Sequence, residues 1–183
     1  MIRLATLILA LLPLEAVAAA WVVDPTRSEI LFTYLRADQP AEGRFARFAG
    51  EGVFDPANPG KAKLEIRIDS ASIDLGEPLA SAFATSAEWF DSRNHPTVTY
   101  TLDALEETSP GEYAATGRLT VRGKTEPITS PLRLSLADGQ AVAEGDLTVA
   151  RRSYRLGVGP AAAFVSIGPD VTVSFRLRAT AAE

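Results

Sequence analysis

Residues 171–178, "VTVSFRLR", alternate apolar and polar side chains without a break. Successive side chains of an extended strand point to opposite faces, so this stretch has one apolar face and one polar face. The apolar face holds Val171, Val173, Phe175 and Leu177. A one-faced pattern is typical of antiparallel sheets, because parallel strands are usually apolar on both faces. The stretch therefore predicts an antiparallel sheet with one side against a core and the other in water.

The same alternation recurs along the chain, and turn residues separate the alternating segments. The further segments are "EILFTYL" at 29–35, "KLEIRID" at 63–69, "TVTYTLD" at 97–103 and "PLRLSLADG" at 131–139. Residues rich in proline, glycine and aspartate interrupt them at 55–60, 109–111, 122–124 and 137–139. About eight strands at this spacing indicate a barrel or a sandwich. Segment 76–92 does not alternate with a period of two. Its apolar residues Leu79, Phe83 and Phe90 are spaced four and seven residues apart, which predicts one or two short helices.

The first twenty residues, "MIRLATLILALLPLEAVAAA", have the features of a Sec-type signal peptide. Arg3 precedes an apolar run, and small residues offer cleavage sites after Ala18 or Ala20. The alternative, a membrane anchor, is disfavoured because Pro13 and Glu15 break the run. We expect a signal peptide over residues 1–20, cleavage near residues 18–20, one mature domain over residues 21–183, and a periplasmic location.

The composition argues against several classes of protein. The formal net charge is −5, so nothing attracts nucleic acid electrostatically. The chain has no cysteine and one histidine, which leaves no disulfide framework and no ligand set for structural zinc. We expect no metal site and no nucleic-acid partner.

The sequence offers little for catalysis. His95 is the only histidine and no G-x-S-x-G motif accompanies it, while the nearby Ser86 and Ser92 stand where helix caps are common. The acidic residues lie mostly in turns or on outward strand positions, and no glycine-rich loop opens a helix to bind phosphate. We expect a protein that is not an enzyme, with His95 in a loop before Pro96.

Two features leave alternatives open. Ala115 and Gly117 fall in line with Leu119, and such small residues indicate either space for a ligand or a bulge in a solid core. Arg151 and Arg155, in "ARRSYRLGVG", are candidate head-group contacts at a pocket mouth, although a solvated loop with extended arginine side chains is the favoured interpretation.

Four ordered blocks resemble the bacterial YceI family of lipid- and polyisoprenoid-binding proteins. The blocks are "WVVDPTRSEILF" at 21–32, "GRFARFAGEGVFDP" at 43–56, "EWFDSRNHPTVTY" at 88–100 and "GRLTVRGKTEPI" at 117–128. One departure is Arg27, at a position where many members have histidine. The resemblance implies an all-β fold, an extended eight-stranded antiparallel barrel like that of lipocalins, enclosing an apolar channel for an isoprenoid chain.

The resemblance implies a periplasmic carrier or sequestering protein that holds an isoprenoid lipid or an isoprenoid quinone and uses no other cofactor. We predict that the apolar faces supply the ligand-binding residues: Phe32, Phe45, Phe48, Leu64, Ile66, Phe83, Trp89, Phe90, Tyr100, Leu119, Leu134, Val173 and Phe175. The alternative is a solid-cored module that docks on a membrane cytochrome or another envelope protein, since "RRSYRLGVG" is similar to a subset of the family found beside membrane di-haem cytochromes. Whether the barrel forms a homodimer stays open.

Overall fold

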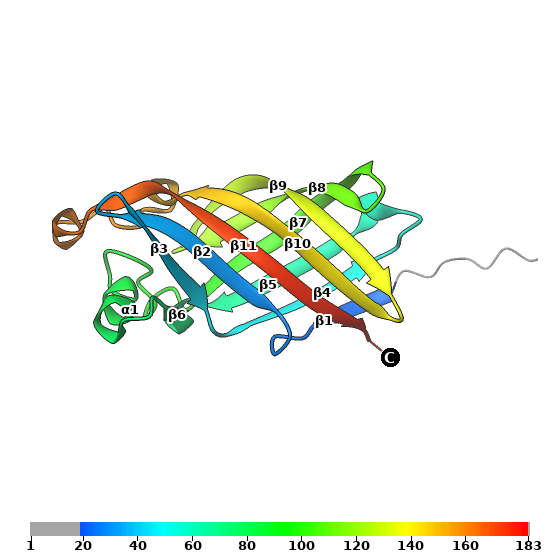
Figure 1. Ribbon diagram of the computed structural model, residues 1–183, viewed down its shortest axis with the longest axis horizontal. Helices are drawn as coiled ribbons and strands as arrows, with labels where there is room; N and C mark the ends of the chain where they lie inside the picture. The colour runs from blue at the N-terminus through cyan, green and yellow to red at the C-terminus, as the bar shows by residue number, and fades with distance from the viewer. Residues whose placement is uncertain (1–18, 183) are drawn as a thin grey trace, which may run out of the picture.

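A computed structural model describes residues 19–182 and shows an elongated antiparallel barrel with helix α1 (Pro78–Ala84) at one end (Figure 1). The strands are β1 (Ala19–Val23), β2 (Glu29–Arg36), β3 (Gln39–Phe45), β4 (Phe48–Phe54), β5 (Lys63–Asp69), β6 (Ile73–Asp74), β7 (Thr97–Ser109), β8 (Glu112–Val121), β9 (Lys124–Ala137), β10 (Gln140–Ala150) and β11 (Ile167–Ala181). The helical elements are α1 (Pro78–Ala84) and the 3₁₀ turns η1 (Pro59–Lys61), η2 (Ser70–Ser72), η3 (Arg151–Tyr154) and η4 (Ala161–Phe164).

The predicted eight-stranded antiparallel barrel is confirmed. Hydrogen-bonded neighbours follow the order β1, β4, β5, β7, β8, β9, β10 and β11, and β11 pairs back with β1 to close the ring. The long β11 also pairs with β2, which continues to β3 and then β6. Strand β6 ends that branch, and α1 with its flanking loops follows it in sequence before β7. At the β1 end, strand pairing therefore closes the wall all the way around the barrel, whereas loops and α1 complete the wall at the other end.

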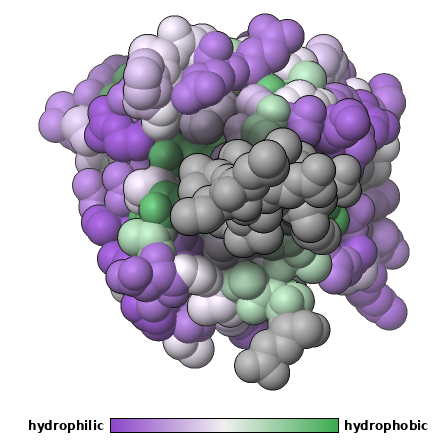
Figure 2. All heavy atoms as spheres, turned by 90° about the vertical axis from the view of Figure 1, so that its right-hand side faces the viewer, coloured by the Kyte–Doolittle hydropathy of each residue, from purple (hydrophilic) through white to green (hydrophobic). Residues whose placement is uncertain are grey.

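The alternation read from the sequence sets which side chains face the interior. In β5, Ile66 and Ile68 are buried, whereas Arg67 between them is exposed. The same parity holds in β2, where Ile30 and Phe32 are buried and Leu31 and Thr33 are exposed. Figure 2, which looks at the barrel end opposite α1, shows a mostly hydrophilic outer surface on the described residues. Burial of the inward apolar faces is the main force that holds the barrel together.

Tight turns of left-handed backbone join several strands. Arg122 and Gly123 have φ values of 50° and 68°, and Asp138 and Gly139 have values of 50° and 70°. Two consecutive positive φ angles match the right-handed twist of paired strands, which is why such turns are favoured in hairpins. The turn between β2 and β3 uses Ala37 and Asp38 at 49° and 61°, without a glycine. The sequence pattern therefore indicated the first two turns but not the third.

Gly117 is required by close approach. A side chain there would meet the backbone oxygen of Thr101 and come within 2.8 Å of the Tyr100 hydroxyl. The register of β7 against β8 also shifts between Leu102 and Ala104, which marks a bulge beside Gly117. The space left by Gly117 is thus occupied by the ring of Tyr100, while the neighbouring Ala115 faces an internal cavity.

The structure has one α-helix in the described range, α1, and the rest of segment 76–92 forms turns. Helix α1 lies at the end of the barrel near β6 (Figure 1). None of the helices within residues 19–182 is long and apolar enough to cross a membrane. The predicted signal peptide lies outside the described residues except for Ala19 and Ala20, which pair with β4. The signal peptide and the domain boundary after it stay predictions.

The outward faces carry ion pairs that make the fold sensitive to acid. Two nitrogens of Arg47 donate to Oδ2 of Asp69 at 2.9 and 2.7 Å, and the Ala71 N–H donates to Oδ1 at 2.9 Å. These hydrogen bonds, those from Arg47 first, hold the pKa of Asp69 below its usual 3.8. Because the pKa is lower in the folded state, the stabilisation is complete above about pH 4 and is lost as the pH falls through the folded value.

We predict that the melting temperature of the wild type falls more steeply below about pH 4 than that of Asp69→Asn, because the variant has no carboxylate at this position to protonate. Thermal unfolding followed by circular dichroism between pH 2 and 7 would measure both curves. The control is Asp170→Asn, on an exposed position of β11, whose curve should follow the wild type. Parallel curves for the wild type and Asp69→Asn would contradict this account.

Candidate functional site

The interior of the barrel contains a cavity of about 490 Å³. This volume lies in the range of about 300–1,000 Å³ that is usual for small-molecule sites. Within the described residues its lining is apolar except for a few side chains: Arg36, Glu77, Arg151, Ser130 and the tyrosines Tyr34 and Tyr100. The interior is therefore hollow, as the leading prediction of an apolar channel requires, and the arrangement suits a long apolar guest.

The cavity opens beside α1 and closes at the other end. Its lining reaches Arg36, Glu77 and Leu79, all exposed, and Leu79 is 87% exposed. We call this end the mouth. The opposite end is lined by the buried side chains of Leu102, Ala115, Ser130 and Leu177, and we call it the inner end.

A buried cluster stops the cavity at its inner end. Leu102, Leu105, Tyr113 and Ala115 pack there with Ala62, whose position is set by η1. All five are at most 9% exposed. The cavity is therefore a blind channel that is entered from the α1 end.

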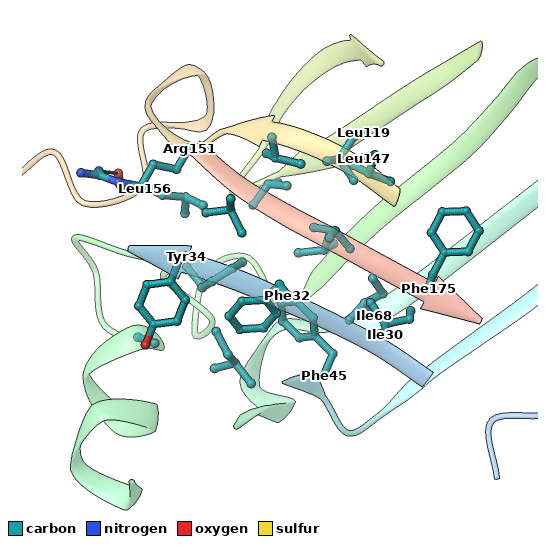
Figure 3. A pocket seen from close by; sticks show the side chains of 18 of the residues that line it. Ile30, Phe32, Tyr34, Phe45, Ile68, Leu119, Leu147, Arg151, Leu156 and Phe175 are labelled. Carbon is teal, nitrogen blue, oxygen red and sulfur yellow. Dashed lines mark hydrogen bonds between the residues drawn. The ribbon is translucent and has the colours of Figure 1, made fainter. Parts of the chain in front are cut away.

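Aromatic side chains from distant parts of the sequence gather near the mouth. The ring of Phe45 lies 5.4 Å from that of Phe32 and 5.7 Å from that of Phe90, nearly perpendicular to the latter. The ring of Phe83, from α1, lies 6.2 Å from that of Trp89. Edge-to-face pairs of this kind stabilise each other beyond simple burial. Figure 3 shows Phe32 and Phe45 facing each other between Tyr34 and the more distant Phe175.

Arg151 lies at the mouth end of the cavity, but its guanidinium is committed to the fold. It is 5% exposed and donates to the backbone oxygens of Leu156 at 2.6 Å, Gly157 at 3.3 Å, Ile167 at 2.8 Å and Gly168 at 2.7 Å. Its guanidinium carbon also lies 5.5 Å from the ring centre of Trp89, a cation–π distance. Burial lowers the pKa of Arg151. Arg151 thus joins η3, the following loop and the start of β11.

The second candidate head-group residue, Arg155, does not line the cavity. It ends η3 with a positive φ of 58°, its side chain is exposed, and its backbone oxygen accepts a hydrogen bond from Arg122. The carbonyl of Ala87 accepts a second bond from Arg122. The arginines near this loop therefore hold the backbone of the mouth, a role that sequence reasoning did not assign to them.

Most of the predicted ligand-binding residues come together around the cavity. Those that line it are Phe32, Phe45, Leu64, Ile66, Phe83, Trp89, Phe90, Tyr100, Leu119, Val173 and Phe175. Their contact with a ligand stays a prediction. Burial of Tyr100, with a smaller contribution from Asp103, raises the pKa of its hydroxyl to about 12, so the group is neutral at ordinary pH.

Two predicted residues lie outside this lining. Phe48 is 9% exposed and belongs to the packed cluster that also contains Val23 and Ile68, so its ring is part of the hydrophobic core. Leu134 lies two residues beyond Leu132, the last residue of β9 that lines the cavity, and packs against the cluster that stops the inner end. Strand parity placed both side chains inward, but parity alone does not tell how far along the barrel the cavity extends.

Sequence reasoning also missed part of the lining. Several missed residues share the inward parity of predicted neighbours and could have been found from it: Ile30, Ile68, Val98, Leu102, Leu147, Val149, Val171 and Leu177. Others come from loops and short elements at the mouth, where no period exists: Ile73, Leu75, Leu156 and Val165. Only the folded chain brings this second group to the cavity.

His95 lies in the turn before β7 and does not line the cavity. Its Nε2 is 3.9 Å from Oδ2 of Asp91, and its backbone oxygen accepts a hydrogen bond of 2.8 Å from Ser70. Within residues 19–182 the ring makes no hydrogen bond to a hydroxyl that could serve as a nucleophile, and no three metal-ligating side chains come together. The loop placement predicted for His95 is what the structure shows.

We predict that Arg151→Met destabilises the protein by about 2–4 kcal/mol, because it leaves several buried backbone oxygens without a donor. Urea unfolding measures the change, and Arg152→Met, on the exposed neighbour in η3, is the matched control. An unchanged stability for Arg151→Met, together with weaker lipid binding, would instead make Arg151 a head-group contact.

Comparisons with known proteins agree with this architecture. A UPF0312 protein of Shewanella sp. strain ANA-3 is 25% identical over 169 residues, which cover 86% of this chain and 88% of that protein. The crystal structure of Burkholderia cenocepacia BcnA superposes with a TM-score of 0.81 at 28% identity, covering 86% of this chain and 99% of that one.

A second solved structure, a polyisoprenoid-binding domain from Saccharophagus degradans implicated in plant cell wall breakdown, gives a TM-score of 0.73 at 18% identity. It covers 90% of this chain and 99% of that chain, and at this identity it shows the fold alone. The family model of the YceI-like domain matches residues 21–179, nearly the whole barrel. The chain therefore belongs to the family of YceI-like domain proteins.

Proposed function

We propose that this protein is a periplasmic carrier or sequestering protein that holds an isoprenoid lipid, including isoprenoid quinones, inside its barrel. The observation that carries the proposal is the blind cavity of about 490 Å³ with its almost wholly apolar lining. The polyisoprenoid-binding neighbour from Saccharophagus degradans supports the choice of ligand class. The periplasmic location rests on the signal peptide predicted from residues 1–20.

Burial of the chain alone supplies enough free energy. Each buried carbon of a hydrocarbon chain contributes about 0.8 kcal/mol, so one isoprene unit contributes up to about 4 kcal/mol. Three such units correspond to about nanomolar affinity before the cost of ordering the ligand and the protein is subtracted. A lipid can therefore be held without a charged anchor. This agrees with the structure, because Arg151 already donates its hydrogen bonds to backbone oxygens.

The rim of the mouth suits entry of a lipid. Leu79, on α1, and Phe164, at the end of η4, are 87% and 91% exposed. Leu79 and its neighbours Ala80 and Phe83 continue into the cavity lining, so an apolar path leads from the surface to the interior. The ion pair between Arg36 and Glu77, 3.5 Å apart, lies at the same rim, where the two opposite charges offset each other.

No catalytic step is part of this proposal. The groups that face the cavity are apolar side chains, hydroxyls, the paired charges of Arg36 and Glu77, and the backbone-bound Arg151, and such a set suits binding. Docking on a membrane cytochrome has no specific observation in its favour. A cavity in place of a solid core favours the carrier over a module that only docks.

The test is to fill the cavity. Ala143 lines it on β10, and Ala143→Phe should place a ring in the ligand's space. We expect protein purified gently from its host to yield an isoprenoid lipid in an organic extract analysed by mass spectrometry, and Ala143→Phe to yield at least about tenfold less.

The control is Ala49→Phe, which makes the same change at an exposed position on β4. It should carry as much lipid as the wild type. Repeated extracts of the folded wild type that contain no lipid, or equal lipid in Ala143→Phe, would overturn the proposed function.

A further inference from the structure

The inner end of the cavity contains a hydroxyl that the fold does not use. Ser130 on β9 is 5% exposed and lines the cavity among apolar neighbours. Its cross-strand partner on β8 is Ala115, which faces the same interior. The Ser130 hydroxyl makes no hydrogen bond among residues 19–182, and it faces the cavity, where a guest can reach it.

A second unused hydroxyl, that of Tyr100, lies over the same face of β8 that Ser130 pairs with. A side chain built on Gly117 would come within 2.8 Å of the hydroxyl oxygen of Tyr100, which places that oxygen over β8. Gly117 and Ala115 lie two residues apart on the same face of β8, and Ala115 pairs with Ser130. The Tyr100 hydroxyl also has no hydrogen-bond partner in the described part of the chain.

The charges around the cavity are all at the opposite end. Its charged lining residues in the described range are Arg36, Glu77 and Arg151, from the end of β2, the start of α1 and η3. Nothing at the inner end could neutralise an anion, so a phosphate or carboxylate there would be a buried, unpaired charge. A neutral oxygen, by contrast, can accept a hydrogen bond from either hydroxyl.

The geometry points to a polar subsite at the inner end, in which Ser130 and Tyr100 bind a neutral hydroxyl or carbonyl oxygen of the lipid. The ligand is then held with this oxygen inward and its hydrocarbon toward the aromatic rings at the mouth. The inference rests on the proposed function and adds the orientation of the ligand and the chemical class of its inner group.

The experiment compares two ligands with one branched carbon skeleton: phytanol, which carries a terminal hydroxyl, and phytane, which has none. Displacement of a fluorescent apolar probe, N-phenyl-1-naphthylamine, gives the two dissociation constants for the wild type and for the variant Ser130→Ala/Tyr100→Phe. We expect the variant to bind phytanol at least about tenfold more weakly and phytane equally well, because only the alcohol loses hydrogen bonds.

A matched control and a stability measurement separate binding from folding. Ser135→Ala makes the same change on the exposed face of β9 and should leave both constants unchanged. Without ligand, the melting temperature of Ser130→Ala should not fall below that of the wild type, because the substitution removes no hydrogen bond of the fold. A melting temperature that falls without ligand would mean that the hydroxyl has a structural role and would contradict the subsite.

The outcomes distinguish the two proposals. If both ligands bind the wild type and the ratio of their constants is the same in Ser130→Ala/Tyr100→Phe, the polar subsite is overturned and the carrier function stands. If neither ligand displaces the probe from the folded wild type, the proposed function fails and this inference fails with it.

Discussion

The closed ring of eight two-faced strands is the constraint on which the rest of the molecule depends. Because side chains alternate along every strand, each apolar face points to one shared interior and each polar face points to water. Burial of the inward faces stabilises the ring, but the inward side chains do not fill it. Small residues such as Ala115, Ser130 and Ala143 leave space at the inner end, and the same force that builds the barrel thus builds a site for an apolar guest.

The mouth follows from the place where strand pairing stops. Strand β6 ends its branch of the sheet, so loops must complete the barrel at that end. Arg151 and Arg122 hold these loops by donating to backbone oxygens, and Glu88 accepts a hydrogen bond from the N–H of Ala162. Charged side chains therefore stabilise the loops beside an apolar opening, and the exposed Leu79 lies at its rim.

The period of two in segments such as 63–69 and 171–178 predicted the strands and their inward faces, and the resemblance to the YceI family favoured a barrel over a sandwich. The same period accounts for the predicted residues that do line the cavity, and for missed residues of equal parity such as Ile68 and Leu177. The sequence could not show that Leu134 lies beyond the blind end, because the depth of a cavity depends on how distant strands pack. Nor could it show that Arg151 bonds to backbone oxygens, because those partners, as far away as Gly168, meet it only in the fold.

A crystal structure of the protein purified gently from its own host tests the central claim most directly. The account predicts continuous electron density for a single elongated apolar molecule inside the barrel, running from the aromatic rings of Phe45 and Phe90 toward Ser130. A barrel interior filled by its own side chains, or occupied only by ordered water, would contradict it.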